Sequence, residues 1–294
     1  MKILSIGEIL WDVFEGVECL GGAPFNFAVH ARRLGHSVRF VSAVGEDERG
    51  DRALAALEQH RFGRGFVERI PGAPTGVARV VLDAEGHPAF TIERPAAYDL
   101  AELSDAALAA LSAWAPGWLY FGTLHQLYPQ ARALTRRALA ACAGARRFYD
   151  VNLRRDSYTP ELVADLLGDA DVLKLNRDEL PVLAWIAGAP AHPIENFCRF
   201  CAGRYGCLAV CVTLGGKGSA VLIREEYVET PAYRVEIRDT VGVGDAFAAA
   251  FLHGLGNGWP AARIADFANR VGALVASRPG AIPQWTFKEA QGLR

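Results

Sequence analysis

The segment DTVGVGDAFAAAFLHGL, residues 239–255, joins a glycine turn to an apolar helix. Upstream, Tyr233, Val235 and Ile237 alternate with charged residues, which predicts a half-buried strand. Downstream, alanine, phenylalanine and leucine recur at helical spacing until Gly254 breaks the pattern. A strand, a glycine turn and a helix start gather backbone N–H groups that have no intrahelical partner, and the helix dipole adds positive potential there.

Such a helix start suits a phosphate or a developing anion. Gly242 and Gly244 would shape the turn, and Asp245 falls in the first helical turn at the mouth of the site. Its carboxylate is expected to stay ionised and to accept a proton from a hydroxyl that attacks phosphorus. An isolated Gly-x-Gly-Asp is more often a structural turn with a capping aspartate. Further stretches of the chain favour the chemical interpretation.

The composition is that of an ordinary globular protein. The chain has 294 residues, 51% of them hydrophobic and 22% charged, with a formal net charge of −2. This balance does not favour nucleic acid or a membrane surface as a partner. The first apolar run is too short for a signal peptide, and no run is long enough to span a bilayer, so we expect a cytoplasmic protein.

Four of the six cysteines cluster, at Cys198, Cys201, Cys207 and Cys211, and suggest a zinc site. The second pair is spaced by three residues and only five residues separate the two pairs, whereas zinc knuckles of this type have a longer loop between them. The segment also has the pattern of a helix followed by a strand. Small core residues in a reducing compartment are therefore the favoured interpretation.

Strands and helices alternate over most of the chain. Expected strands are 2–7, 38–44, 118–121, 147–151, 172–175 and 208–213, and expected helices are 47–59, 106–113, 129–142, 160–167, 179–186 and 194–205. This order predicts an α/β fold, a mostly parallel sheet with helices on both faces. Without an internal repeat or a low-complexity linker, a single domain over 1–294 is the simplest organisation.

The stretch 66–93 interrupts the alternation. Residues 77–82 and 89–93, joined by a turn at 83–86, read as a β-hairpin. A small β excursion of this kind is a candidate lid over a site. A plain edge hairpin is the alternative.

Polar residues near the N-terminus fall where ligands bind in open sheets. Asp12 follows the first strand, near the carboxyl edge at which such sheets bind ligands. Gly22 permits close approach of the backbone, Pro24 opens a helix and Gly35 closes it. Asn26 would then present its amide from the first turn. An exposed loop and an ordinary helix start are the alternatives.

Two later strand ends carry polar residues. Asn176 and Glu179 are three residues apart, share one face of a helix start, and could hold water around Mg²⁺. The run 213–218, TLGGKG, is not a P-loop because Gly218 follows the lysine directly. It is either a hairpin turn or a backbone surface for a nucleotide, and both interpretations stay open.

Four stretches in a fixed order resemble the ribokinase-like (PfkB) carbohydrate kinases. They are 21–26, Asn176-x-x-Glu179, Thr213-x-Gly215-x-x-Gly218 and 239–245. The resemblance covers essentially the whole chain. Segments 7–12, 21–26, 92–99 and 174–176 look most like bacterial fructokinases. It implies a three-layer α/β/α fold with a central mostly parallel sheet and a small β lid from about 10–20 and 66–98.

The resemblance also implies roles for individual residues. Asp245 would be the catalytic base, with Gly242, Val243 and Gly244 forming an anion hole together with its backbone. The other implied contacts are Asp12, Gly22, Asn26 and Arg154 to the sugar, Asn176 and Glu179 to Mg²⁺ and phosphates, and Thr213, Gly215, Gly218 and Asn269 to ATP.

Many such kinases bind K⁺ beside the anion hole. The matching positions are Asp239, Val241, Val275, Arg278 and Gly280. Gln284 stands where ribokinases often carry a serine ligand, so the K⁺ site stays open.

The function implied is transfer of the γ-phosphoryl group of ATP to fructose, giving fructose 6-phosphate. The same chemistry on 2-keto-3-deoxygluconate, ribose or a nucleoside is an alternative. An acid sugar would need a further arginine, such as Arg94 or Arg154, and a nucleoside would need an aromatic platform from Phe14, Phe25 or Tyr98. A non-catalytic sugar or nucleotide sensor is an alternative of another class.

Lids of these kinases often pair, so a homodimer through the lid is a further expectation. A dinucleotide-binding dehydrogenase is set aside, because no Gly-x-Gly-x-x-Gly follows the first strand.

Overall fold

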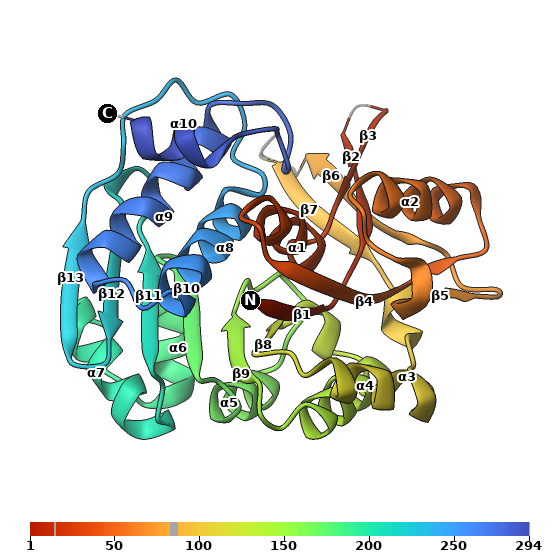
Figure 1. The fold of residues 1–294 in the computed structure, drawn as a ribbon, viewed down its shortest axis with the longest axis horizontal. Coiled ribbons are helices and arrows are strands. Elements are labelled where there is room, and N and C mark those ends of the chain that lie inside the picture. Colours follow the sequence, from red (N-terminus) through yellow and green to blue (C-terminus); the bar gives the residue numbers. More distant parts are fainter. Residues whose placement is uncertain (15, 83–87, 294) are drawn as a thin grey trace.

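The computed structural model describes residues 1–14, 16–82 and 88–293. The turn expected at 83–86 lies outside these residues. The main sheet has nine strands in the order β13-β12-β11-β10-β9-β8-β1-β4-β5 (Figure 1). Their bounds are β1 Lys2–Ile6, β4 Ser37–Gly45, β5 Val67–Ile70, β8 Trp118–Gly122, β9 Arg146–Asp150, β10 Val172–Asn176, β11 Ala209–Thr213, β12 Ser219–Ile223 and β13 Glu226–Thr230.

The strands from β5 to β11 pair in parallel, and β12 and β13 add an antiparallel edge. After β1 the chain moves to β4 on one side, and it later returns to β8 on the other side. The sequence order therefore reverses between β1 and β8. Open α/β sheets bind ligands beyond the carboxyl ends of the strands at such a point.

Helices cover both faces of the sheet, as the alternating pattern predicted (Figure 1). The core on one face includes α1 Ala23–Arg33, α2 Glu48–Gln59, α8 Val243–Gly256, α9 Ala261–Ala276 and α10 Phe287–Gly292. The core on the other face includes α3 Asp105–Trp114, α4 Pro129–Ala141, α5 Pro160–Gly168, α6 Leu180–Ala187 and α7 Ile194–Tyr205. Short 3₁₀ turns lie at Arg64–Phe66, Ala97–Leu100, Leu124–Gln126 and Gly215–Lys217.

A second, four-stranded sheet lies beside the main one, in the order β3-β2-β6-β7 (Figure 1). Its strands are β2 Leu10–Phe14, β3 Val17–Gly21, β6 Gly76–Leu82 and β7 Pro88–Glu93. The hairpin expected within 66–93 is confirmed, because β6 and β7 pair antiparallel. The assignment of 67–70 to the lid is wrong, because β5 pairs with β4 and extends the main sheet.

The helix α8 is buried along most of its length between α1 and α9. Alanines at 246 and 248–250 give it a narrow profile, which lets both neighbours approach closely. Its N-terminus is thereby fixed beneath the carboxyl ends of the central strands. Small residues in this helix thus fix the position of Asp245.

The strand expected upstream of α8 is absent, and residues 231–238 are irregular. Half-buried and exposed residues do alternate over part of this segment. The amides of Arg238 and Asp239, however, donate to the Ala276 carbonyl at the end of α9. No strand partner therefore pairs with this part of the segment. The backbone instead ties the turn before α8 to the end of α9.

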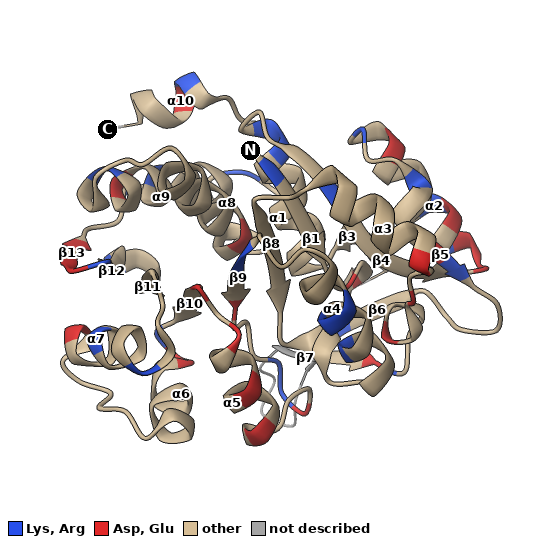
Figure 2. Ribbon diagram, turned by 60° about the horizontal axis from the view of Figure 1, so that its bottom comes forward, with Lys and Arg blue, Asp and Glu red and all other residues tan. Residues whose placement is uncertain are grey.

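The four clustered cysteines are buried core residues, as predicted. Cys198, Cys201 and Cys207 pack on the side of α7, and Cys211 on the opposite face. All six cysteines are free thiols. In the described ranges, no helix is long and apolar enough to cross a membrane. Lys and Arg are mixed with Asp and Glu along outer helices such as α2 and α7 (Figure 2).

Candidate active site

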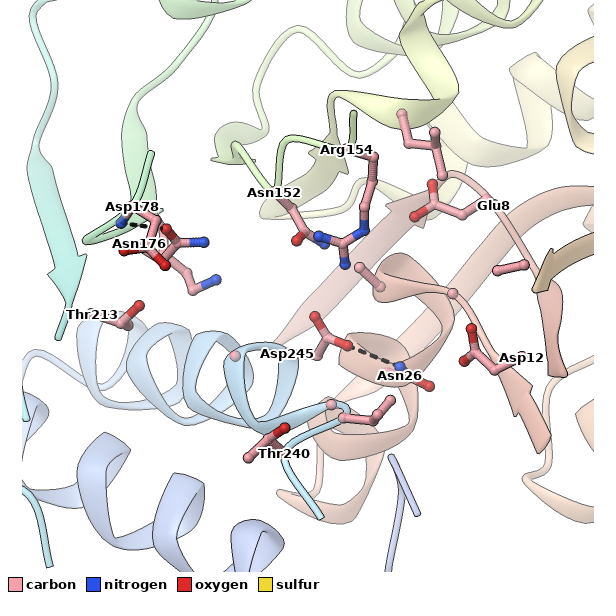
Figure 3. Close-up of a pocket in the computed structure, with 18 of the residues that line it drawn as sticks. Glu8, Asp12, Asn26, Asn152, Arg154, Asn176, Asp178, Thr213, Thr240 and Asp245 are labelled. Atoms are coloured by element: carbon pink, nitrogen blue, oxygen red, sulfur yellow. Dashed lines mark hydrogen bonds between the residues drawn. The ribbon is translucent and has the colours of Figure 1, made fainter. Parts of the chain in front are cut away.

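A cavity of about 690 Å³ opens beyond the carboxyl ends of the strands. One end is lined by Leu10, Ala78 and Ile92 of the small sheet. The other end is lined by Thr213 and Gly215, where β11 turns into β12. The N-terminus of α8 lies between the two ends (Figure 3).

The turn into α8 needs a glycine at 242. Gly242 has φ 74°, and a Cβ atom on it would lie 2.3 Å from the Ala281 carbonyl oxygen. The first helical hydrogen bond runs from the Ala246 amide to the Gly242 carbonyl, at 2.9 Å. The amides of residues 243–245 have no partner among the described residues. Free N–H groups and the helix dipole together make this point attractive to an anion.

Asp245 is buried at this helix start, and its Oδ2 accepts a hydrogen bond from Asn26 Nδ2 at 2.9 Å. Burial and, after it, the Asp150 carboxylate raise its pKa to about 6. Asn26, Lys174 and Arg154 act in the opposite direction. A carboxylate with a pKa just below neutrality is ionised at pH 7 and is still basic enough to take a proton.

Three carboxylates and one guanidinium face the same space near the small sheet. Figure 3 shows Glu8, Asp12, Asp245 and Arg154 around it. Burial raises the pKa of Glu8 to about 7 and that of Asp12 to about 6, and Arg154 lowers all three carboxyl pKa values. Among the described residues, no hydrogen-bond partner reaches the buried Oε2 atom of Glu8 or the buried Oδ1 atom of Asn26. Unpartnered buried acceptors of this kind are suited to ligand hydroxyls.

A buried ion pair lies beneath the helix start. Lys174 Nζ contacts both carboxylate oxygens of Asp150 at 2.8 Å, and the Tyr120 hydroxyl donates to the same carboxylate at 2.8 Å. A Cβ atom on Gly244 would lie 3.4 Å from Lys174 Nζ. The ammonium group therefore lies against the backbone of the α8 N-terminus.

The far end of the cavity is built from loops after β10 and β11. Asn176 Oδ1 accepts from the amides of Asp178 and Glu179, each at 2.9 Å, which fixes the turn after β10. The Arg177 amide donates to the Thr213 carbonyl and joins that turn to β11. Besides the backbone of these loops, the charged residues Arg177 and Asp178 line this end of the cavity.

A family model described as "pfkB family carbohydrate kinase" matches residues 6–287. This chain belongs to the pfkB family. It is 32% identical over 308 residues to a fructokinase of Klebsiella pneumoniae, and the alignment covers 98% of this chain and 97% of that protein. It is 29% identical to an aminoimidazole riboside kinase of Salmonella typhimurium, over 98% and 93% of the two chains. A crystal structure of a fructokinase with bound ATP from Xylella fastidiosa superposes with a TM-score of 0.85 at 26% identity, over 99% and 97%.

The protein is therefore a fructokinase-like carbohydrate kinase, a phosphotransferase with an alcohol acceptor, and its ribokinase-like fold is confirmed. In this pfkB kinase the predicted sugar residues Asp12, Gly22, Asn26 and Arg154 all line the cavity with Asp245. A Cβ atom on Gly22 would lie 2.5 Å from the Glu8 carbonyl oxygen, which accounts for the glycine.

Three predicted nucleotide residues lie outside the cavity lining. Both carboxylate oxygens of Glu179 accept backbone amides, from Leu153 and Asn176, at 2.7 Å. The side chain of Asn269 donates to the carbonyls of residues 230 and 231 at 3.2 Å. Gly218 belongs to the β11–β12 turn, so the hairpin alternative for 213–218 is correct for that residue. In this pfkB kinase all three residues hold loops in place.

The five predicted K⁺ positions lie near one another beside α8. Asp239 accepts from the amides of Val241 and Gly280, each at 2.9 Å, and joins the two segments. Val275 accepts from the Arg278 amide at 3.1 Å. Arg278 extends its guanidinium to the Gln284 carbonyl and to Glu289. Only Val241 of the five lines the cavity.

Sequence reasoning missed Glu8, Asp150 and Lys174. Glu8 and Lys174 stood within stretches that resemble fructokinases, at a strand end and inside a strand. Asp150 is the last residue of β9. A charged residue within an apolar parallel strand was the available signal, because such a position is normally buried.

Proposed function

We propose that the protein transfers the γ-phosphoryl group of ATP to a neutral sugar, with fructose as substrate and fructose 6-phosphate as product. The observation that carries the proposal is Asp245, a buried carboxylate held by Asn26 at a helix N-terminus between the two ends of one cavity. We call the end beside the small sheet the polyol end and the end beside the loops after β10 and β11 the nucleotide end. The fructokinase relatives support the choice of sugar.

In the reaction, Asp245 accepts the proton of the attacking sugar hydroxyl. The sugar oxygen forms a bond to the γ-phosphorus as the bond from that phosphorus to the ADP oxygen breaks. The free amides of residues 243–245, shaped by Gly242, stabilise the charge on the transferring group. Each donor of this kind contributes roughly 3 kcal/mol in comparable anion holes.

The charges at the polyol end favour a neutral sugar over an acid sugar. Three carboxylates share Arg154 there. Arg94, the other cation considered for a substrate carboxylate, is bound to Asp99 and to the Leu124 carbonyl and does not line the cavity. A 2-keto-3-deoxygluconate carboxylate would meet Asp12 and Asp245 as like charges, with Arg154 as the cation at this end, whereas a neutral sugar meets no like charge.

A nucleoside is the second candidate, since an aminoimidazole riboside kinase is among the relatives. The described residues that line the cavity include no aromatic side chain. Phe25 and Tyr98 are buried in cores, and the Phe14 side chain lies outside the described positions. The described lining therefore offers the base no stacking platform of the kind expected for this substrate class.

At the nucleotide end we propose that Asn176, Thr213 and Gly215 contact ATP. Mg²⁺ is expected to enter with the phosphates and keep several waters. Asp178 offers an exposed carboxylate that faces the cavity and can accept from those waters. Glu179 fits a supporting role, because its oxygens already hold the backbone on either side. Bound Mg²⁺ would neutralise phosphate charge during transfer.

Four expectations remain proposals. K⁺ would bind by carbonyls around Asp239, although Gln284 is not the serine of ribokinases. Asn269 would contribute to ATP binding indirectly, through the carbonyls at 230 and 231. The small sheet, residues 10–21 and 76–93, would act as a lid and pair two copies. The cytoplasm would be the site of action, which the six free thiols support.

An ADP-release assay over a panel of sugars tests the proposal. Purified protein with Mg-ATP and K⁺ is given fructose, ribose, 2-keto-3-deoxygluconate and nucleosides in turn. Turnover with fructose and none with the acid sugar is the expected result. Turnover led by a nucleoside would replace the substrate, and ATP binding without turnover on any member would favour the sensor.

A further inference from the structure

We propose that Lys174 is a further catalytic residue, contacting the transferring phosphoryl group from the strand side, and that Asp150 and Tyr120 position it. This inference rests on the proposed function. It concerns the face of the anion site opposite the helix amides.

The geometry places the ammonium group at the point of transfer. Lys174 lies in β10 two residues before Asn176, on the same side of the strand, and both line the cavity. Its Nζ lies 3.4 Å from where a Cβ atom on Gly244 would be. An anion held by the amides of α8 would therefore lie beside the ammonium group.

The ammonium group also has bonding capacity left. It carries three N–H donors, and the described residues supply one partner, the Asp150 carboxylate. Both oxygens of that carboxylate accept from Lys174, and one of them also accepts from the Tyr120 hydroxyl. At least one N–H of Lys174 is thus free for a phosphoryl oxygen.

Packing alone does not explain the pair. Lys174 and Asp150 are both buried, and burial of an ion pair costs about as much as the attraction returns. Apolar residues on the same central strands would give a core of similar stability. A charged pair at the cavity wall is explained when its cation meets an anionic ligand.

The pair also acts on the base. The groups that face Asp245 from the surrounding elements are Asn26, Arg154, Glu8, Tyr120, Asp150 and Lys174. Asp150 raises the pKa of Asp245 and Lys174 lowers it. Removing one member of the pair should therefore move the acid limb of the rate profile in the direction opposite to removing the other. Both shifts follow from the charges of the pair, whereas a contact to the phosphoryl group also changes the binding of a phosphoryl mimic.

The test compares Lys174→Met and Asp150→Asn, with Tyr149→Phe as the matched control. Tyr149 lies next to Asp150 in β9 and loses an equally buried hydrogen bond, to Thr123, but does not line the cavity. We expect Lys174→Met to lower kcat about 100-fold or more, with KM for fructose within twofold. Its acid limb should move to higher pH, that of Asp150→Asn to lower pH, and that of Tyr149→Phe should not move.

A second readout does not depend on turnover. Mg-ADP with aluminium fluoride mimics the phosphoryl group in transfer, and adding the fluoride should raise the Tm of the wild type and of Tyr149→Phe above the value with Mg-ADP alone. Lys174→Met should lose that increment. An equal increment in Lys174→Met, or its kcat within threefold of the wild type, would overturn the proposal. If the wild type phosphorylates nothing in the panel, the proposed function fails, and the Lys174 assignment is still decided by this melting measurement.

Discussion

At the scale of single residues, the chemistry of Asp245 is set by a contest between burial and hydrogen bonding. The helix start and Asn26 favour the carboxylate, while burial and Asp150 favour the acid, and burial is the largest effect. The pKa settles near 6, higher than an exposed aspartate at a helix N-terminus would have. The residue is therefore mostly ionised at neutral pH and mostly protonated in mild acid.

The pH dependence of kcat/KM follows from that value. Asp245 must be ionised to accept a proton, so the rate should fall as pH decreases through about 6. A tenfold fall per pH unit below that point is expected, and a steeper one if Asp12 must also be ionised. Initial rates from pH 5 to 8.5 at low fructose measure this limb. A flat profile down to pH 5 would remove Asp245 as the base.

Glu8 should affect stability as well as sugar binding. Its pKa of about 7 lies above the ordinary 4.5, so its protonated form fits the fold and stability is lost as pH rises through 7. Glutamine cannot ionise, so Glu8→Gln should be more stable than the wild type at pH 8, by at most roughly 3 kcal/mol.

Thermal melting at pH 5 and pH 8 checks this expectation. The gain of Glu8→Gln should fall to roughly a quarter at pH 5, where the folded wild-type side chain is largely protonated. The same gain at both values would mean that ionisation is not the cause. KM for fructose should rise several-fold, because an amide replaces an unpartnered carboxyl oxygen at the polyol end.

Which residues the sequence could identify depends on how local their signal is. Asp245, Gly242 and Asn26 stand at helix starts marked by glycine or proline, so local pattern and family resemblance both pointed to them. Asp150 and Lys174 meet only because β9 and β10 pair in register. Glu8 follows the first strand without a motif of its own, and its significance comes from burial near distant charged residues such as Arg154 and Asp245. Tertiary contacts of this kind have no local signature.

At the scale of elements, the turn into α8 depends on the backbone of one glycine. Gly242→Ala would combine a left-handed backbone with a contact of 2.3 Å to the Ala281 carbonyl oxygen. Gly258→Ala has a similar φ, 68°, and no atom within 4 Å. It should cost about 1 kcal/mol, the price of the left-handed conformation alone.

Urea unfolding of the two variants separates strain from collision. Gly242→Ala should lose clearly more stability than Gly258→Ala, and most of its kcat, because the amides of α8 would be displaced. Equal losses in the two variants, with kcat retained, would mean that this turn does not build the anion site.

Elements were predictable where hydrophobic periodicity and packing agree. For the parallel strands β1, β4 and β8 to β11 and the helices between them, the observed bounds agree with the predicted ones to within about two residues. The strand predicted at 233–237 was wrong, because alternating exposure shows only that a segment is half-buried, whereas a strand also needs a pairing partner. The amides that follow this segment bond to the end of α9 instead. The placement of 67–70 in the lid was wrong, because the sequence of a short edge strand does not indicate which of two sheets the strand joins.

At the scale of the whole molecule, the two ends of the cavity belong to different parts of the fold. The small sheet supplies Leu10, Ala78 and Ile92, and the loops after β10 and β11 supply the opposite end. Hydrogen exchange should therefore separate the two ligands. Fructose should slow exchange at 10–13 and 76–79, and a non-hydrolysable ATP analogue should slow it at 175–179 and 213–216. Protection in the reverse pattern would invert the assignment of the two ends.

The most direct test of the central claim is kcat for Asp245→Asn with fructose and Mg-ATP, measured beside ATP binding by calorimetry. Asparagine keeps the shape and the contact to Asn26 but cannot accept the proton. We predict a loss of about 10²–10⁴-fold in kcat with the melting temperature and ATP affinity close to those of the wild type. Turnover within tenfold of the wild type would contradict the assignment of Asp245 as the base and, with it, the account of this cavity as a sugar kinase site.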